Sequence, residues 1–128
     1  MKGVMAITIA ASVVVMAGGC SQSTVTNSNE IVFPDSLVSY RNHVQPFMTL
    51  RCGQCHGETV AAGGIRLTQW TYLMFDRPNL VVPNEPQNSL VIQVLERLVA
   101  HPSGQLETIP APQIRGVRTW IAEGAENN

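Results

Sequence analysis

Two cysteines and a histidine near the middle of the sequence are spaced for covalent chemistry. They stand in the run Cys52-Gly53-Gln54-Cys55-His56. Two thiols at this spacing can add to the two vinyl groups of one porphyrin, and an imidazole directly after the second thiol can reach the iron from one face. The Cys-x-x-Cys-His pattern therefore predicts one covalently attached haem c on Cys52 and Cys55, with His56 as the proximal iron ligand.

The same cysteines have two alternative interpretations, a zinc site and a thiol redox site. A structural zinc ion needs four protein ligands, and outside the motif the chain offers only Cys20, His43 and His101. A thioredoxin-like Cys-x-x-Cys follows a strand in a βαβ pattern, and no such pattern surrounds this motif. Haem attachment is therefore the favoured interpretation.

Residues 1–19 have the pattern of an export signal. Lys2 gives a positive start, and residues 3–19 form an uncharged, mostly apolar run that ends in small residues. Ala17-Gly18-Gly19-Cys20 resembles a lipobox, where a bacterial signal is removed before a lipid-modified cysteine, although Ala17 stands where leucine or valine is usual. We therefore predict lipidation of Cys20, with an ordinary signal peptide and an uncleaved anchor as the alternatives.

The three cysteines support this scheme because two are assigned to haem and one to lipid. No structural disulfide is expected, although the compartment would be oxidising. Haem attachment of this type takes place outside the cytoplasmic membrane. The export signal and the haem motif thus predict the same location, the periplasmic side of a bacterial membrane.

A single domain is expected at residues 34–128. Residues 20–33 begin with a run of Ser, Thr and Asn, which predicts a flexible tether, and contacts with the domain are expected to start at Ile31 to Phe33. The net charge of −1 implies no strong attraction to nucleic acid. Because only 5% of the residues are aromatic, a covalent haem would supply a large apolar body for the core.

The domain is predicted to be all-α, with about four to five helices around one haem, because no strand pattern of any length appears. Capping residues, prolines and apolar periodicity mark the helices. They are a helix capped by Asp35 or Ser36, a helix from Pro46 to about Cys52, a short helix 69–75 capped by Thr68, an amphipathic helix 89–100 capped by Ser89, and a last helix from 111 or 112 to 123 closed by Gly124.

Several blocks of residues 44–125 resemble the small class I c-type cytochromes common in environmental bacteria. The resemblance implies a few helices around one haem, with the first and last helices crossed, and single-electron transfer as the activity. The blocks are Val44-Gln45-Pro46, the haem motif with Gly57, Ala62-Gly63-Gly64-Ile65-Arg66-Leu67, residues 82–91, and Trp120-Ile121-Ala122-Glu123-Gly124-Ala125.

The sequence departs from this family at the sixth iron ligand. The family usually supplies a methionine from the loop before the last helix, whereas residues 101–110 contain none and Leu106 stands near its place. His101 is the first candidate for the sixth ligand, and Met74 is the second. An open or water-filled site is a third hypothesis, and a solvated His101 that caps the preceding helix is the alternative for that residue.

Two further side chains are candidates for contact with the haem. The Arg66 guanidinium matches a propionate in forked geometry, although a solvated loop arginine is an equal alternative. Trp70 either donates its indole N–H to a propionate or forms a wall of the haem pocket. The second ring nitrogen of His56 is expected to donate to a backbone carbonyl.

These features predict a lipid-tethered periplasmic electron carrier that exchanges single electrons with redox partner proteins, alone or as a relay subunit of a larger complex. We do not expect an enzyme, since the chain provides one haem and no recognisable distal Arg/His pair of a peroxidase. The missing methionine supports an alternative function. That alternative is the binding or sensing of a diatomic gas at an open or labile sixth site.

Overall fold

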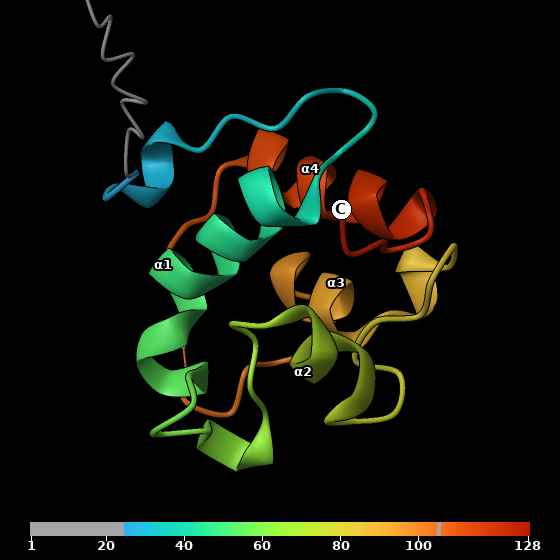
Figure 1. Ribbon diagram of the computed structural model, residues 1–128. Coiled ribbons are helices and arrows are strands. Elements are labelled where there is room, and N and C mark those ends of the chain that lie inside the picture. Colours follow the sequence, from blue (N-terminus) through green and yellow to red (C-terminus); the bar gives the residue numbers. More distant parts are fainter. Residues whose placement is uncertain (1–24, 105) are drawn as a thin grey trace, which may run out of the picture.

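The computed structural model describes residues 25–104 and 106–128, and this part of the chain is all-α, as predicted (Figure 1). The predicted signal peptide and Cys20 lie outside the described residues. Within those two ranges no strand is present, and no helix is long and apolar enough to cross a membrane. The helices are α1 (Gln45–His56), α2 (Trp70–Phe75), α3 (Leu90–Leu95) and α4 (Ala111–Ala122), with short helical turns η1 (Ser28–Glu30), η2 (Tyr40–Val44), η3 (Ala62–Gly64) and η4 (Pro86–Asn88).

The first and last helices frame the domain. In Figure 1, α4 runs across the upper end of α1, and α3 and α2 lie below α4. Their inner faces share one hydrophobic core, and burying each large apolar side chain stabilises the fold by about 1.5–3 kcal/mol. Its fully buried members include Val44, Phe47, Met48, Leu73, Ile92, Val117, Trp120 and Ile121.

The first helical segment begins later than predicted. Ser39, rather than Ser36, is the N-cap of η2, a π-helical turn that runs directly into α1. The backbone N–H of Ser39 donates to Nδ1 of His43 at 3.0 Å, which satisfies a donor at the start of the turn. Leu37 has left-handed backbone geometry (φ 55°) and a side chain that is 87% exposed, so it does not join the buried face.

Contacts from the other end of the chain explain this late start. The backbone N–H groups of Leu37 and Val38 donate to the Glu123 carboxylate at 2.7 and 2.9 Å. The carbonyl oxygen of Asn128 accepts from the N–H of Arg41 at 3.0 Å. Residues 37 and 38 are therefore bound to the end of α4 and are not available for a helical turn.

The haem motif lies entirely within α1, which continues to His56 instead of ending near Cys52. Pro46 occupies the first turn, as predicted, where its missing N–H costs nothing. Cys52, Cys55 and His56 occupy positions i, i+3 and i+4 of one helix. These spacings bring side chains to one face, so α1 presents the three groups together.

Helix α3 is shorter than the predicted helix 89–100. It ends at Leu95 in a Schellman motif, in which the N–H of Leu98 donates to the Gln93 carbonyl at 2.8 Å and Arg97 takes a φ of 61°. Leu98, which lies within the predicted amphipathic helix, is 72% exposed as a result. The chain leaves α3 early and turns toward His101.

Two predicted capping side chains have other roles or positions. Ser89 precedes α3, but its hydroxyl accepts from the N–H of Val82 at 2.8 Å and donates to the carbonyl of Glu85 at 3.1 Å. The N-cap of α2 is Gln69 rather than Thr68. The buried hydroxyl of Ser89 therefore stabilises the loop that contains Val82 and Glu85 and does not cap α3.

The last helix agrees with its prediction. Val117, Trp120 and Ile121 are buried and Ile114 is partly buried. Gly124 takes a φ of 107°, and its N–H donates to the Ile121 carbonyl at 3.0 Å, which closes α4 as a glycine cap.

Contacts between the N-terminal segment and the domain begin earlier than residue 31. The buried amide of Gln113 on α4 donates to the carbonyls of Ser28 at 2.6 Å and Ile31 at 3.1 Å. Phe33 packs over Gly116 of α4. At least residues 28–33 of the predicted tether therefore lie against the domain.

Candidate haem site

His56 lies at the end of α1 with one ring nitrogen fixed by the backbone. Its Nδ1 atom lies 3.0 Å from the carbonyl oxygen of Ile65. A carbonyl can only accept a hydrogen bond, so Nδ1 carries the proton and donates. The neutral ring then keeps its lone pair on Nε2, which is the arrangement expected of a metal-binding histidine.

The group that faces this lone pair is the imidazole of His101. The two Nε2 atoms are 3.5 Å apart. The ring centroids are further apart, at 5.8 Å, so the rings meet end to end through their Nε2 atoms, with their planes at 90°. Nδ1 of His101 lies 2.7 Å from the hydroxyl oxygen of Ser103. Each histidine thus has one ring nitrogen bound to a protein oxygen and the other directed at its counterpart.

This arrangement fits a metal ion between the two rings. Two imidazole nitrogens on opposite sides of one metal, each bound at about 2.0–2.1 Å, lie about 4 Å apart. The observed 3.5 Å is close to that separation. If both Nδ1 atoms donate, the two Nε2 lone pairs point at each other, and only a cation between them makes that contact favourable.

The donor set fits haem iron better than a structural zinc ion. Across residues 25–104 and 106–128, no group of three or more His, Cys, Asp or Glu side chains is placed to hold a metal ion. A structural zinc ion takes four protein ligands. Haem iron needs only axial ligands from the protein, and one pair of histidines supplies both.

The two motif cysteines are free thiols that differ in exposure. Cys52 is partly buried against the core, whereas Cys55 is exposed. Burial raises the pKa of the Cys52 thiol to about 11. Reactive Cys-x-x-Cys pairs have a lowered thiol pKa instead, so this environment does not favour the thiol redox interpretation.

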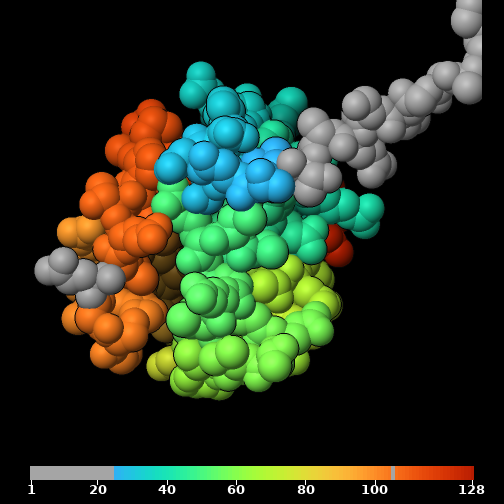
Figure 2. Space-filling model, turned by 90° about the vertical axis from the view of Figure 1, so that its left-hand side faces the viewer, coloured from blue at the N-terminus to red at the C-terminus, as the bar shows by residue number. Residues whose placement is uncertain are grey.

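A crevice separates the two segments that carry the histidines. The space-filling view shows it between the end of α1 and the segment that follows α3 (Figure 2). Ile65, whose carbonyl oxygen lies 3.0 Å from Nδ1 of His56, is a partly buried apolar residue that packs on the core. At least one apolar residue of the core therefore adjoins the histidine pair.

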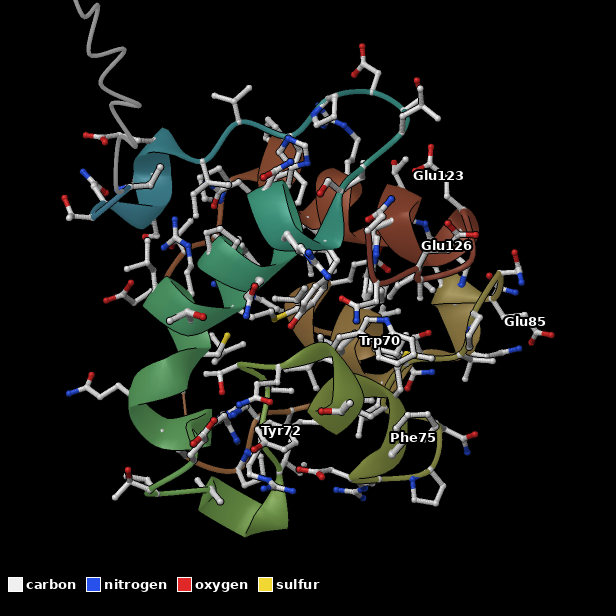
Figure 3. All side chains as sticks on the ribbon, viewed as in Figure 1. Trp70, Tyr72, Phe75, Glu85, Glu123 and Glu126 are labelled. Carbon is white, nitrogen blue, oxygen red and sulfur yellow. The ribbon has the colours of Figure 1, made fainter. Side chains whose placement is uncertain are left out.

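The two donors proposed for the haem propionates have other partners. The Arg66 guanidinium forms a fork on the Asp76 carboxylate, with two contacts of 2.7 Å, and lies 3.7 Å from the centre of the Tyr72 ring. The indole N–H of Trp70 donates to the Ala125 carbonyl at 2.7 Å. Figure 3 shows Trp70 and Tyr72 on the α2 side of the domain. To bind a propionate, Arg66 would have to give up its bonds to Asp76, and Trp70 its bond to Ala125. The partly buried ring of Trp70 is still suited to form a wall of the pocket.

Met74, the second candidate for the sixth ligand, is partly buried against the hydrophobic core. Leu106, which stands near the place of the family's methionine, lines a small hollow with Arg97 and Ile114. His101 is the candidate that the fold brings to Nε2 of His56. The sequence analysis did not identify Ser103 as the partner of His101, although a hydroxyl two residues after a candidate ligand could have indicated it. No local pattern indicates that the Ile65 carbonyl accepts from His56.

Comparison with known protein families finds a match that includes the haem motif. The family model of Planctomycete cytochrome C matches residues 52–100, from the first motif cysteine to the residue before His101. The match supports a c-type cytochrome domain. That assignment implies a covalent haem c and suggests electron transfer through the haem. Comparison of the chain with curated proteins and with solved structures finds no match.

Proposed function

We propose that this protein is a single-electron carrier with one haem c, bound through Cys52 and Cys55 and ligated by His56 and His101. The observation that carries the proposal is the end-to-end placement of the two imidazoles, with their Nε2 atoms 3.5 Å apart. The two rings belong to α1 and to the segment that follows α3, which border the crevice (Figure 2), and their Nδ1 atoms lie within hydrogen-bond distance of Ile65 and Ser103.

Bound haem would supply an iron centre that alternates between ferric and ferrous states. The chain's own contribution is the pair of imidazoles of His56 and His101, which would hold the iron and would exclude substrates and gases from it. The hydrogen bond from His56 to Ile65 fixes one ring, so its orientation is set in advance. Two imidazoles should give a lower reduction potential than a methionine and a histidine, because a methionine ligand raises the potential.

We further propose an exported protein anchored through lipid on Cys20, which places the haem at the periplasmic side of a bacterial membrane. The support is the apolar run before Cys20 and the position of the haem motif in the same chain. Redox partner proteins would dock transiently over small interfaces. A net charge of −1 suits such contacts, since no strong charge has to be neutralised.

A second candidate function, the binding of a diatomic gas, is favoured by the segment that carries His101. In the described part of residues 101–110, the one backbone hydrogen bond within the segment runs from the N–H of Gly104 to the His101 carbonyl. A loop with so few bonds opens at low cost. His101 would then leave the iron and make room for the gas.

A redox titration followed by absorption tests the electron-carrier function. The protein is produced in cells that attach haem c, and denaturation in alkaline pyridine first shows whether the haem is covalent. The proposal expects a reversible one-electron transition and rapid exchange of electrons with small redox reagents. Haem that is lost on denaturation, or a ferrous protein that takes up carbon monoxide during the titration, would contradict it.

A further inference from the structure

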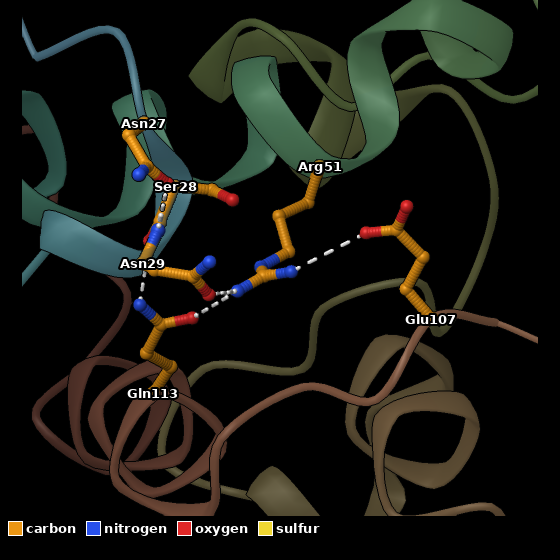
Figure 4. A network of polar contacts seen from close by, with 6 residues as sticks. All are labelled: Asn27, Ser28, Asn29, Arg51, Glu107 and Gln113. Atoms are coloured by element: carbon orange, nitrogen blue, oxygen red, sulfur yellow. Dashed lines mark hydrogen bonds and ion pairs between the residues drawn. The ribbon is translucent and has the colours of Figure 1, made fainter.

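Arg51 is a buried cation on α1, one residue before the haem-binding Cys52. Only 6% of its side chain is exposed. Its guanidinium donates to the amide oxygens of Asn29 at 2.7 Å and Gln113 at 3.1 Å (Figure 4). Helix α1, the N-terminal segment and α4 therefore surround this charge with neutral oxygen atoms.

The charge of Arg51 is only weakly compensated. The carboxylate of Glu107 lies 3.5 Å away, but its side chain is 89% exposed and so is screened by water. Nε of Arg51 is buried and has no hydrogen-bond partner among the described residues. A buried ion that lacks full pairing is costly to keep. An arginine at this buried position is therefore easier to explain if its charge has a role beyond the contacts with the N-terminal segment and α4.

We propose that Arg51 raises the reduction potential of the haem through its buried positive charge. This inference rests on the proposed electron-carrier function. Oxidation adds one positive charge to the iron, so a nearby buried cation disfavours the ferric state. Arg51 precedes His56 by five residues on α1, a rise of about 7.5 Å along the helix. Two unit charges about 10–15 Å apart at an effective dielectric constant near 20 change the redox equilibrium by roughly 6- to 16-fold, which is about 50–70 mV for one electron.

Charge and structure can be separated with two substitutions at the same position. Arg51→Gln removes the charge and keeps a side chain that can hydrogen-bond, whereas Arg51→Lys keeps the charge and loses the forked contacts. The equilibrium constant for electron exchange with a reference redox couple is measured for both, together with the free energy of unfolding in denaturant. We expect Arg51→Gln to favour the ferric state about tenfold and Arg51→Lys to stay within about threefold of the wild type.

Two further variants complete the experiment. Glu107→Gln removes the nearby carboxylate and should shift the equilibrium in the opposite direction, toward the ferrous state, by about twofold. This variant keeps the test decisive if Arg51→Gln does not fold. Arg41→Gln removes an exposed arginine on η2 and is the matched control, with less than a twofold change expected because exposed charges are screened.

The proposal fails if Arg51→Gln leaves the potential unchanged, or if Arg51→Lys lowers it as much as Arg51→Gln does. A loss of stability in both variants with an unchanged potential would assign Arg51 a structural role alone. Failure of the wild type to bind haem covalently would instead refute the proposed function. That result is seen in the pyridine assay before any potential is measured.

Discussion

The contact between Gly116 of α4 and Phe33 allows a sharp test of how the N-terminal segment is held. A Cβ atom at position 116 would lie 2.1 Å from Cγ of Phe33, 2.2 Å from Cδ1 and 2.4 Å from Cβ. The Phe33 ring is also in contact range of Phe47, with ring centroids 5.8 Å apart. In Gly116→Ala the phenyl ring must therefore leave its place on the helix.

Two opposing effects set the magnitude. Alanine is favoured over glycine in a helix interior by about 1 kcal/mol, whereas forcing extra volume into a packed contact costs about 1–3 kcal/mol. Losing the packing of a large aromatic side chain altogether costs about 3 kcal/mol. We expect Gly116→Ala to lower the free energy of unfolding by about 1–2 kcal/mol, as measured by urea denaturation followed by circular dichroism.

The same substitution in a Phe33→Gly background gives the decisive control, because Phe33→Gly removes Cβ of residue 33, 2.4 Å from the new Cβ, together with the ring. With the whole side chain of residue 33 removed, Gly116→Ala should raise the free energy of unfolding by about 1 kcal/mol, because only the helix preference remains. The effect of one substitution thus reverses its sign with the background. A neutral or stabilising Gly116→Ala in the wild-type background would refute the reasoning.

Three other substitutions test local features of the fold. Arg97 takes a φ of 61° at the end of α3, so Arg97→Gly should stabilise the protein by about 1 kcal/mol in urea unfolding; a loss of stability would contradict this account of the helix end. Burial raises the pKa of Tyr40 to about 12, and its hydroxyl has no hydrogen-bond partner among residues 25–104 and 106–128. Because unfolded tyrosine ionises near pH 10, the free energy of unfolding of the wild type should fall as the pH rises from about 10 to 12. Unfolding measured over that pH range should show no such fall in Tyr40→Phe. The forked bond from Arg66 lowers the pKa of Asp76. The carboxylate therefore stabilises the fold above about pH 4, and this stabilisation is lost as the pH falls further. Asp76→Asn should not show this acid-dependent loss of stability, and an acid unfolding profile equal to that of the wild type would count against the ion pair.

Local signals in the sequence predicted some elements well. The apolar spacing of α4, with Val117, Trp120 and Ile121 buried, follows from a period that needs no knowledge of the partner surface. Gly124 closes that helix because a left-handed residue is needed there. The all-α class was predictable because apolar spacing of this helical kind is a local property of the sequence.

Two helix boundaries were placed wrongly because they depend on features without a local sequence signal. The start of the first helix depends on the Glu123 carboxylate, which binds backbone N–H groups more than eighty residues away in sequence. The end of α3 depends on a left-handed turn at Arg97, where a glycine would have been the usual signal. Neither feature has a local pattern that predicts it.

The site shows the same division. The haem motif is a local pattern, and its three side chains fall on one helix as a consequence. His101 was one of several candidates, and the fold alone brings it to His56 across 45 residues. The roles proposed for Arg66 and Trp70 depended on free donors, and the acceptors that engage them, Asp76 and Ala125, were not evident in the sequence.

The most direct test of the central claim is the absorption spectrum of the ferrous protein with and without carbon monoxide. If His56 and His101 both bind the iron, the wild-type spectrum should not respond to the gas. His101→Ala should respond clearly, because the substitution opens the sixth position. A wild-type protein that binds carbon monoxide at once would contradict histidine ligation on both sides and favour the gas-binding function. No response in His101→Ala would show that another residue, such as Met74, is the sixth ligand.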